Sequence, residues 1–257
     1  MKIAVKTQAE LLAMRAGGKK LIEIFKVLKS EVKPGTTLKE LDKLAIETTK
    51  QLGGVPAFLG YEGYPAAVCV SVNSGIVHCI PTDYQLQEGD LISVDCGLLF
   101  EDMYTDAAVT WIVGKDINGY SKLLRATHAA LLAGTNQARA GITIGEISSA
   151  IEKSLKKSQL TIMRQFVGHG IGKKLHEPPI VPNFMGHDKD VVLPTGSTIA
   201  IEPIAGLGSE DYKTEEDRWS TRTLDNSVVA HFEHTIAITD DGYEVLTPLD
   251  EIIDVRA

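Results

Sequence analysis

Cysteine is scarce in this sequence, which has only three in 257 residues. Cys69, Cys79 and Cys96 form an odd, sparse set, so they do not suit the disulfide framework of a small secreted protein. The N-terminal residues 1–6 also lack the apolar run of a secretory signal peptide. Together these absences predict a protein that works in the reducing cytoplasm.

Long apolar runs and an excess of positive charge are absent as well. No stretch approaches the roughly 18 apolar residues that span a bilayer, so we expect no membrane partner. The formal net charge of −8 disfavours a general affinity for DNA or other nucleic acid. The length fits one large domain or two small ones, and the 44% hydrophobic and 23% charged composition is that of an ordinary globular enzyme.

Several widespread nucleotide-binding and catalytic motifs are missing too. Residues 17–20 (GGKK) lack the upstream glycine and the Ser/Thr of a phosphate-binding loop. Residues 168–173 (GHGIGK) end in lysine where a dinucleotide fingerprint needs glycine. Residues 176–180 (HEPPI) begin like a zinc-protease helix, but their prolines forbid the helix. No serine-hydrolase elbow occurs, so any chemistry must come from other residues.

An internal echo organises the chain. Residues 33–41 resemble residues 139–147 at an offset of 106, and each copy follows a helical apolar pattern and precedes β-like runs. Helix-starting capping boxes are predicted at Thr7/Glu10, Thr37/Glu40 and Thr143/Glu146, and strands over residues 66–72, 91–99, 103–113, 162–166, 197–204 and 228–239. We therefore expect an α+β fold, with an antiparallel sheet covered on one face by helices. It would form a single catalytic domain over residues 1–257, built from two pseudo-symmetric halves of about 1–115 and 116–257.

Carboxylates inside apolar strands are the most informative residues. If the hairpin turns between Phe100 and Glu101, Asp95 and Asp106 lie directly opposite each other, with Cβ atoms about 4.5–5.5 Å apart. Two facing carboxylates repel unless one is protonated or a cation lies between them. The plainer alternative is that one of the two acids faces solvent.

Glu202 and Glu233 repeat this anomaly in two further apolar strands, and alternation puts His231 on the same face as Glu233. His169 lies among glycines, which allow close backbone approach to a site. An exposed polar face and a structural histidine are the alternatives. As a set, two Asp, two Glu and one His suit Mn²⁺, Fe²⁺ or Co²⁺ rather than structural zinc. Four carboxylates can hold two divalent ions roughly 3.5–4 Å apart that activate a water.

At these residues the sequence resembles the methionine aminopeptidases of the short type I, nearly end to end. The matching segments, in order, are residues 59–65, 72–73, 78–81, 94–95, 105–106, 168–172, 176–179, 201–203 and 232–235. The resemblance implies the duplicated pita-bread (creatinase/aminopeptidase) fold. It also implies a dinuclear-metal aminopeptidase that removes the initiator methionine from nascent proteins with a small second residue. The expected partner is that N-terminal peptide, with at most a transient ribosome contact, and the expected state is a monomer.

The same resemblance implies roles for individual residues. Asp95 would hold one metal ion, Asp106 and Glu233 would bridge both, and His169 and Glu202 would hold the other. The cofactors would be two divalent ions, Mn²⁺, Fe²⁺ or Co²⁺, with Zn²⁺ as a further candidate. The catalytic residues would be Glu202 as proton shuttle, His176 against the tetrahedral intermediate and His78 at the substrate backbone. The methionine pocket would include Phe58, Tyr61, Tyr64, Cys69, Trp219 and Ile204.

Some positions depart from the commonest family pattern, and two competing functions stay open. Phe58, Gly97, Leu175 and Ile204 differ from the residues usual there, which affects pocket shape and inhibitor preference. A proline-specific peptidase of the same fold is the nearest rival, although such enzymes usually carry an additional N-terminal domain. A metal-free binding relative is the other, although such relatives usually lack several of the five ligands.

Overall fold

The computed structural model describes residues 3–186 and 188–253. Its helices are α1 (Gln8–Glu31), α2 (Leu38–Gln51), α3 (Ser121–Thr135) and α4 (Ile144–Lys157), with a 3₁₀ turn at Tyr61–Gly63. Its strands are β1 (Val55–Pro56), β2 (Val68–Val72), β3 (Leu91–Phe100), β4 (Met103–Ile112), β5 (Thr161–Ile162), β6 (Gly168–Gly170), β7 (Glu177–Val181), β8 (Thr198–Ile201), β9 (Ile204–Gly206), β10 (Tyr212–Thr214), β11 (Thr221–Thr223), β12 (Val229–His231), β13 (Glu233–Thr239) and β14 (Gly242–Val245). None of the helices in the described ranges combines the length and the apolar character needed to cross a membrane.

The three predicted capping boxes are confirmed. Thr7, Thr37 and Thr143 each cap a helix, and each side chain accepts a hydrogen bond from the backbone N–H three residues later. Helix α3 has no such side chain at its start. There the Asp116 carboxylate accepts hydrogen bonds from the backbone N–H groups of Tyr120 and Ser121 instead. A carboxylate at this position also favours the positive end of the helix dipole.

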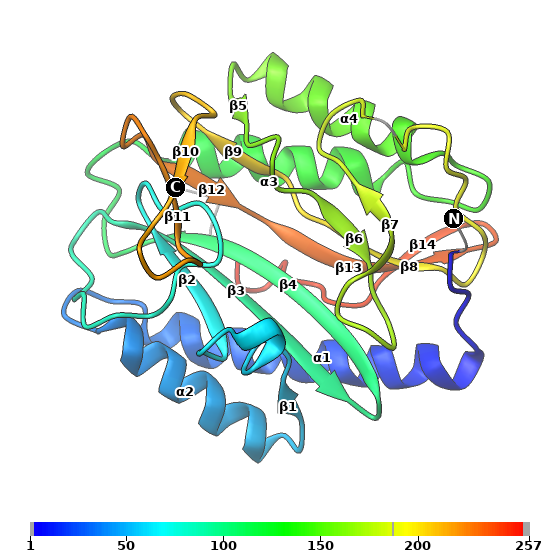
Figure 1. Ribbon diagram of the computed structural model, residues 1–257, viewed down its shortest axis with the longest axis horizontal. Coiled ribbons are helices and arrows are strands. Elements are labelled where there is room, and N and C mark those ends of the chain that lie inside the picture. The colour runs from blue at the N-terminus through cyan, green and yellow to red at the C-terminus, as the bar shows by residue number, and fades with distance from the viewer. Residues whose placement is uncertain (1–2, 187, 254–257) are drawn as a thin grey trace.

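One nine-stranded antiparallel sheet forms the centre of the molecule. Its main path runs β1-β3-β4-β13-β8-β6-β7, with β2 added on β3 and β14 on β13. In Figure 1 the long hairpin of β3 and β4 lies between the helix pair α1 and α2 and the pair α3 and α4. Helix α1 packs on β3 and β4, and α3 packs on β8, β9, β12 and β13. The largest buried apolar cluster joins these helices to the sheet.

The internal echo extends from sequence to hydrogen bonding. Gly35 donates its backbone N–H to the Leu86 carbonyl oxygen (2.8 Å), and Gly141, 106 positions later, donates to the Leu193 carbonyl oxygen (2.9 Å). Both glycines have positive φ, 92° and 80°, a conformation that glycine adopts without strain. Isolated antiparallel bridges follow at Thr37–Gln85 and Thr143–Val192. These matched contacts support the predicted halves, whose boundaries stay a prediction.

Three strand predictions need correction. Of the predicted strand 162–166 only Ile162 is in a strand, β5, because the backbone N–H of Phe166 turns back to donate to the Met163 carbonyl oxygen. The segment 197–204 is divided into β8 and β9 at Glu202 and Pro203, since proline has no N–H to continue the ladder. The segment 228–239 is divided into β12 and β13 at Phe232. Both divisions fall beside residues of the predicted metal site.

The predicted register of the first hairpin is wrong by two residues. Asp95 pairs with Ala108, and Asp106 pairs with Gly97. The cause is the turn, which Glu101 and Asp102 make with positive φ values of 48° and 59°, the geometry of a two-residue hairpin. A shift of two keeps side chains on the same face. Asp95 and Asp106 are therefore diagonal neighbours rather than a directly opposed pair.

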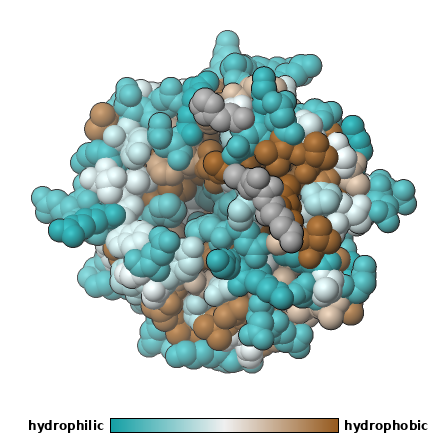
Figure 2. All heavy atoms as spheres, turned by 45° about the vertical axis from the view of Figure 1, so that its right-hand side comes forward, coloured by the Kyte–Doolittle hydropathy of each residue, from teal (hydrophilic) through white to brown (hydrophobic). Residues whose placement is uncertain are grey.

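The outer surface shows no single dominant apolar area in the orientation of Figure 2, where hydrophobic residues form separate patches among hydrophilic ones. Large exposed hydrophobic side chains are likewise spread over many elements, from Val5 and Leu12 to Leu224. Scattered apolar residues of this kind are normal on globular proteins. The functional site must therefore be sought in a concave feature.

Candidate metal centre and substrate cavity

A cavity of about 300 Å³ lies beside the point where β4 meets β13. All of the predicted metal ligands and catalytic residues line it, together with five of the six predicted pocket residues. These lining residues are Asp95, Asp106, His169, Glu202, Glu233, His78, His176, Phe58, Tyr61, Tyr64, Cys69 and Trp219. The structure thus brings together residues that lie up to 175 positions apart, from Phe58 to Glu233.

The four acids of this cavity are buried close to one another. Burial raises the pKa of Asp106 to about 7. The pKa values of Asp95, Glu202 and Glu233 are raised well above the usual range, first by burial and then by the negative charge of the neighbouring carboxylates. Burying several like charges together is costly unless they share protons or a cation. Residues whose pKa values are shifted this strongly inside a cavity are candidates for a functional role.

The donor atoms of this cluster fit a bound cation. Atoms of Asp106, His169 and Glu233 lie within 4.8 Å of one another. Asp95 Oδ1 and Glu233 Oε1 are buried and have no hydrogen-bond partner, which a native structure usually explains by an ion or a water. Glu202 Oε1 lies 3.8 Å from His169 Nε2. Hard carboxylate oxygens with one imidazole match the preference of Mn²⁺, Fe²⁺ and Co²⁺.

His169 is oriented for such a role by its own backbone. Its Nδ1 lies 2.9 Å from the Gly170 carbonyl oxygen, so Nδ1 carries the proton and Nε2 is free to face the acids. Burial lowers the pKa of His169 to about 3, which keeps the imidazole neutral at physiological pH. A neutral imidazole is the form that ligates metals.

Thr235 ties the first half of the chain to the second at this site. Its hydroxyl donates to the Asp106 carbonyl oxygen (2.7 Å) and accepts from the Asp106 backbone N–H (2.9 Å). Strand β13, which carries Thr235 and Glu233, is thereby held against β4. The relative position of Asp106 and Glu233 depends on this contact.

His176 and His78 both line the cavity. His176 Nδ1 is 3.0 Å from the Tyr61 hydroxyl, and its ring lies 4.4 Å from the ring of His169, centroid to centroid. His78 has a positive φ of 56° and packs edge-on against Phe166. Burial lowers the pKa of both His78 and His176. Positive φ at a bulky residue is costly, so it often marks a position that function requires.

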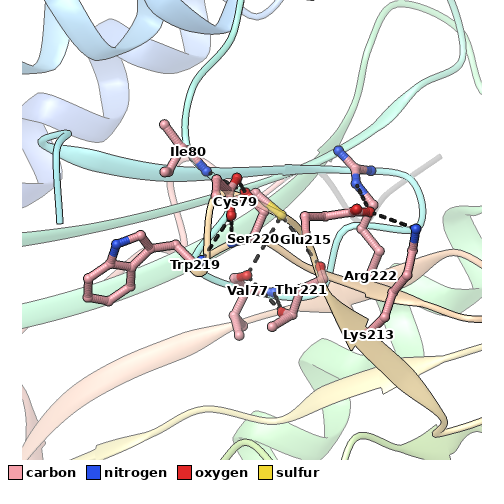
Figure 3. Close-up of polar contacts among 10 residues, drawn as sticks. Val77, Cys79, Ile80, Lys213, Glu215, Trp219, Ser220, Thr221 and Arg222 are labelled. Carbon is pink, nitrogen blue, oxygen red and sulfur yellow. Dashed lines mark hydrogen bonds and ion pairs between the residues drawn. The ribbon is translucent and has the colours of Figure 1, made fainter.

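The segment that carries His78 is bonded to the segment that carries Trp219, as Figure 3 shows. Ile80 donates its backbone N–H to Ser220 Oγ (3.1 Å), and Thr221 Oγ1 donates to the Val77 carbonyl oxygen (2.9 Å). The Cys79 thiol donates to the Thr221 carbonyl oxygen at 3.6 Å. These contacts fix two walls of the cavity relative to each other.

The predicted methionine pocket is only partly assembled from the predicted residues. Tyr64 and Trp219 meet edge to face with centroids 5.3 Å apart, and the Tyr64 hydroxyl donates to backbone carbonyl oxygens. Ile204 does not line the cavity; it is fully buried in β9 and belongs to a separate apolar cluster with Met163 and Val229. We therefore leave Ile204 out of the pocket, and the other five assignments stay predictions.

Phe58 and Gly97, two of the unusual positions, touch each other. A Cβ atom at position 97 would lie 2.8 Å from Phe58 Cε1 and 2.9 Å from Ala57 Cβ. Both distances are too short for real side chains, so glycine at 97 provides the space in which the Phe58 ring lies. The position of the Phe58 ring in the cavity wall therefore depends on the missing side chain at Gly97.

His231 is the main cavity residue to which the sequence assigned no role. It is 2% exposed, and its Nε2 lies 3.8 Å from Glu202 Oε2 without a hydrogen-bond partner. Burial lowers its pKa to about 3. The available signal was its alternation with Glu233 in an apolar strand. Other lining residues without a distinctive sequence pattern are Glu62, Val77, Gln165, Phe166, Val167, Leu175 and Ile180.

Comparisons with known proteins agree with this geometry. The profile of Metallopeptidase family M24 matches residues 13–240. Methionine aminopeptidase 1 of Bacillus subtilis is 40% identical over 245 residues, which cover 95% of this chain and 99% of that protein. The structure of a methionine aminopeptidase from Thermotoga maritima superposes with a TM-score of 0.93 at 39% identity, covering 96% of this chain and 99% of that chain. The predicted α+β pita-bread fold is confirmed.

The proline-specific rival matches less of its own length. A prolidase from Pyrococcus furiosus superposes with a TM-score of 0.76 at 21% identity. The match covers 95% of this chain but only 65% of the prolidase. At this identity the likeness shows a shared fold and nothing about the substrate.

Proposed function

The chain belongs to metallopeptidase family M24 and matches methionine aminopeptidases over nearly its whole length, and we propose that it hydrolyses the peptide bond after an N-terminal methionine. Its substrate is the N-terminus of newly made proteins. One observation carries the proposal: the five candidate metal ligands line the same cavity as His78 and His176. The resemblance inferred from the sequence is confirmed at the level of the family.

We propose that two divalent ions bind here, held by Asp95, Asp106, His169, Glu202 and Glu233. The buried, unpartnered oxygens of Asp95 and Glu233 support this assignment. When bound, the ions supply Lewis acidity and an activated water. Mn²⁺, Fe²⁺ and Co²⁺ fit the donor set best, and Zn²⁺ is the further candidate.

The residues around the ions divide the remaining work. Glu202 carries a proton between the attacking water and the leaving amine, since its carboxylate faces the cavity and its pKa is raised by burial. His176 donates a hydrogen bond to the developing oxyanion. Burial raises the pKa of Tyr61, so its phenol stays protonated and donates to His176 Nδ1. The imidazole proton is then on Nε2, where a donor to the substrate is needed.

His78 contacts the substrate backbone near the scissile bond. Phe58, Tyr61, Tyr64, Cys69 and Trp219 form the methionine pocket, because aromatic faces and a thiol suit an unbranched thioether.

The second substrate residue lies against the crowded acids, so a small side chain is preferred there. A free amine at the N-terminus is required, and an N-formyl group prevents cleavage.

The cellular setting is part of the proposal. A cytoplasmic monomer that meets nascent N-terminal peptides, with a transient ribosome contact, agrees with the negative net charge and the three free cysteines. DNA and membranes are not among the proposed partners.

A direct assay separates the proposal from its rivals. Protein loaded separately with Mn²⁺, Fe²⁺, Co²⁺ or Zn²⁺ should release methionine from Met-Ala-Ser and leave Xaa-Pro peptides intact. EDTA should abolish the activity, and fresh metal should restore it. Cleavage of Xaa-Pro alone would establish the proline-specific rival, and absence of bound metal with no cleavage would establish the binding relative.

A further inference from the structure

A buried ion pair joins the residue after His176 to the segment that precedes α1. Lys6 Nζ and Glu177 Oε2 are 2.6 Å apart, and the two side chains are only 4% and 9% exposed. Lys6 belongs to the extended segment before α1, whereas Glu177 begins β7 and follows His176 in sequence. Among the described residues, every other salt bridge between a lysine or arginine and an acid has at least one side chain that is more exposed than Lys6 and Glu177 are.

Both ends of the pair are fastened to the backbone. Glu177 uses its second oxygen, Oε1, to accept the backbone N–H of Lys174 (3.0 Å). Lys6 donates its own backbone N–H to the Gly196 carbonyl oxygen (2.8 Å), just before β8. The Glu177 carboxylate thus connects the loop to the Lys6 side chain, and the backbone N–H of Lys6 connects its segment to Gly196, just before β8.

Gly172 makes room for this arrangement. A Cβ atom at position 172 would lie 2.2 Å from Lys6 Cε and 2.7 Å from Lys6 Nζ. The carbonyl oxygen of Gly172 accepts the backbone N–H of Tyr104 (2.7 Å), which holds the start of the loop against β4. Gly172, the last glycine of the segment 168–172, therefore leaves space for the Lys6 side chain rather than for the metal cluster.

We infer that Lys6 and Glu177 are positioning residues that fix His176 over the reacting centre. The inference rests on the proposed role of His176. Tyr61 orients the His176 ring through a hydrogen bond at Nδ1. The position of the His176 Cα atom is set by the loop backbone, and Glu177 is the adjacent residue in that loop. Removing one charge leaves the other buried and unpaired, so the loop must move to hydrate it. A displacement of about 1 Å at a catalytic group can lower turnover about 10²-fold.

The test compares Lys6→Met and Glu177→Gln with Lys173→Met in the full-length, metal-loaded protein. Lys173 is on the same loop and pairs with Glu10 at 2.7 Å, but its side chain is 71% exposed, so its loss should leave turnover unchanged. The two buried variants should lose about 10–100-fold in kcat. Their KM and bound metal, measured by mass spectrometry, should stay near the wild-type values.

A double-mutant cycle with His176→Ala separates positioning from general stability. Lys6→Met should lower kcat in the wild-type background and have little further effect when His176 is already absent. An equal loss in both backgrounds would overturn the inference. Wild-type kcat in His176→Ala itself would instead refute the proposed role of His176, so the two failures are distinguishable.

Two further variants decide the matter if a single charge removal prevents folding. Lys6→Met combined with Glu177→Gln removes both charges, which is less disruptive than removing one. Gly172→Ala keeps both charges but crowds the ammonium group. The double variant still lacks the ion pair that ties the loop to Lys6, so each folded variant should show a loss of kcat with retained metal. Wild-type kcat in a folded, metal-loaded double variant would show that the pair does not position His176.

Discussion

Residues 33–41 and 139–147 begin equivalent helices, α2 and α4, in the two predicted halves. The strands that follow carry the predicted ligands in different ways. In the first half, Asp95 and Asp106 lie in two uninterrupted ten-residue strands. In the second half, Glu202 lies in the break between β8 and β9, and Glu233 is the first residue after the break at Phe232. His169 lies in a three-residue strand.

The difference shows two ways of placing a ligand. A long hairpin sets its side chains by register, so the distance between Asp95 and Asp106 follows from the turn at Glu101 and Asp102. Interrupted strands free a carboxylate from strict alternation and leave room beside it. The second half thereby places its three predicted ligands, His169, Glu202 and Glu233, in the same cavity as Asp95, Asp106 and His176.

Removing Asp106 should have the largest effect, because it lies in an uninterrupted strand and is the proposed bridge between the two ions. Asp106→Ala should lose both bound metal and measurable methionine release. Metal content by mass spectrometry and steady-state turnover on Met-Ala-Ser, measured on the same preparation, check this. Two ions retained at full occupancy would contradict the bridging assignment.

Removing His176 should spare the metal, because this residue lies on a loop of the second half and is not a proposed ligand. His176→Ala should lower turnover about 10²–10³-fold, the usual cost of losing one oxyanion donor. The same paired measurement applies. Asp106→Ala should lose bound metal, whereas His176→Ala should retain it. A wild-type rate for His176→Ala would show that His176 has no role in catalysis.

Metal affinity should rise with pH through neutrality, because the proposed carboxylate ligands have raised pKa values and must lose their protons to bind a cation. Asp106, with its pKa of about 7, binds a proton below that pH and must release it before a cation binds. Affinity therefore falls by about tenfold per pH unit for each proton displaced as the pH drops below 7. His169, with its pKa of about 3, is already neutral and adds no slope. Calorimetric titration with Mn²⁺ on both sides of pH 7 tests this, and a flat profile would contradict it.

Gly97→Ala should disturb the first half at its contact with Phe58. The added methyl group meets Phe58 and Ala57 at 2.8 and 2.9 Å, and overpacking of this kind costs about 1–3 kcal/mol of stability. Thermal unfolding measures that cost. Phe58→Ala in the same chain should relieve the part of this cost that comes from the Phe58 ring, and full additivity of the two changes would show that the contact with Phe58 is not a cause.

The smallest effect should also be the most symmetrical. Thr37→Ala and Thr143→Ala remove equivalent helix caps from the two halves, and each should cost about 1 kcal/mol. Urea unfolding of the two variants should therefore give similar losses. A clear difference would show that the repeat does not extend to the energetics of the two helices.

The sequence by itself determined the local structure and the chemical types in the site. The three capping boxes predicted where α1, α2 and α4 begin, because each is a contact between residues three apart. Acids at 95, 106, 202 and 233 in apolar strands indicated a cation, since burial of charge requires compensation whatever the fold. The resemblance to a known family then supplied the arrangement that these residues imply.

Only the tertiary structure decided the register, the strand breaks and the outer support of the site. A turn one residue later moved the Asp95–Asp106 pairing by two, and alternation is unaffected by such a shift, so the pattern could not reveal it. Ile204 was excluded from the cavity, and His231 was included, by packing between β9, β12 and β5. The Lys6–Glu177 pair spans 171 positions, and no local pattern indicates which distant charges will be buried together.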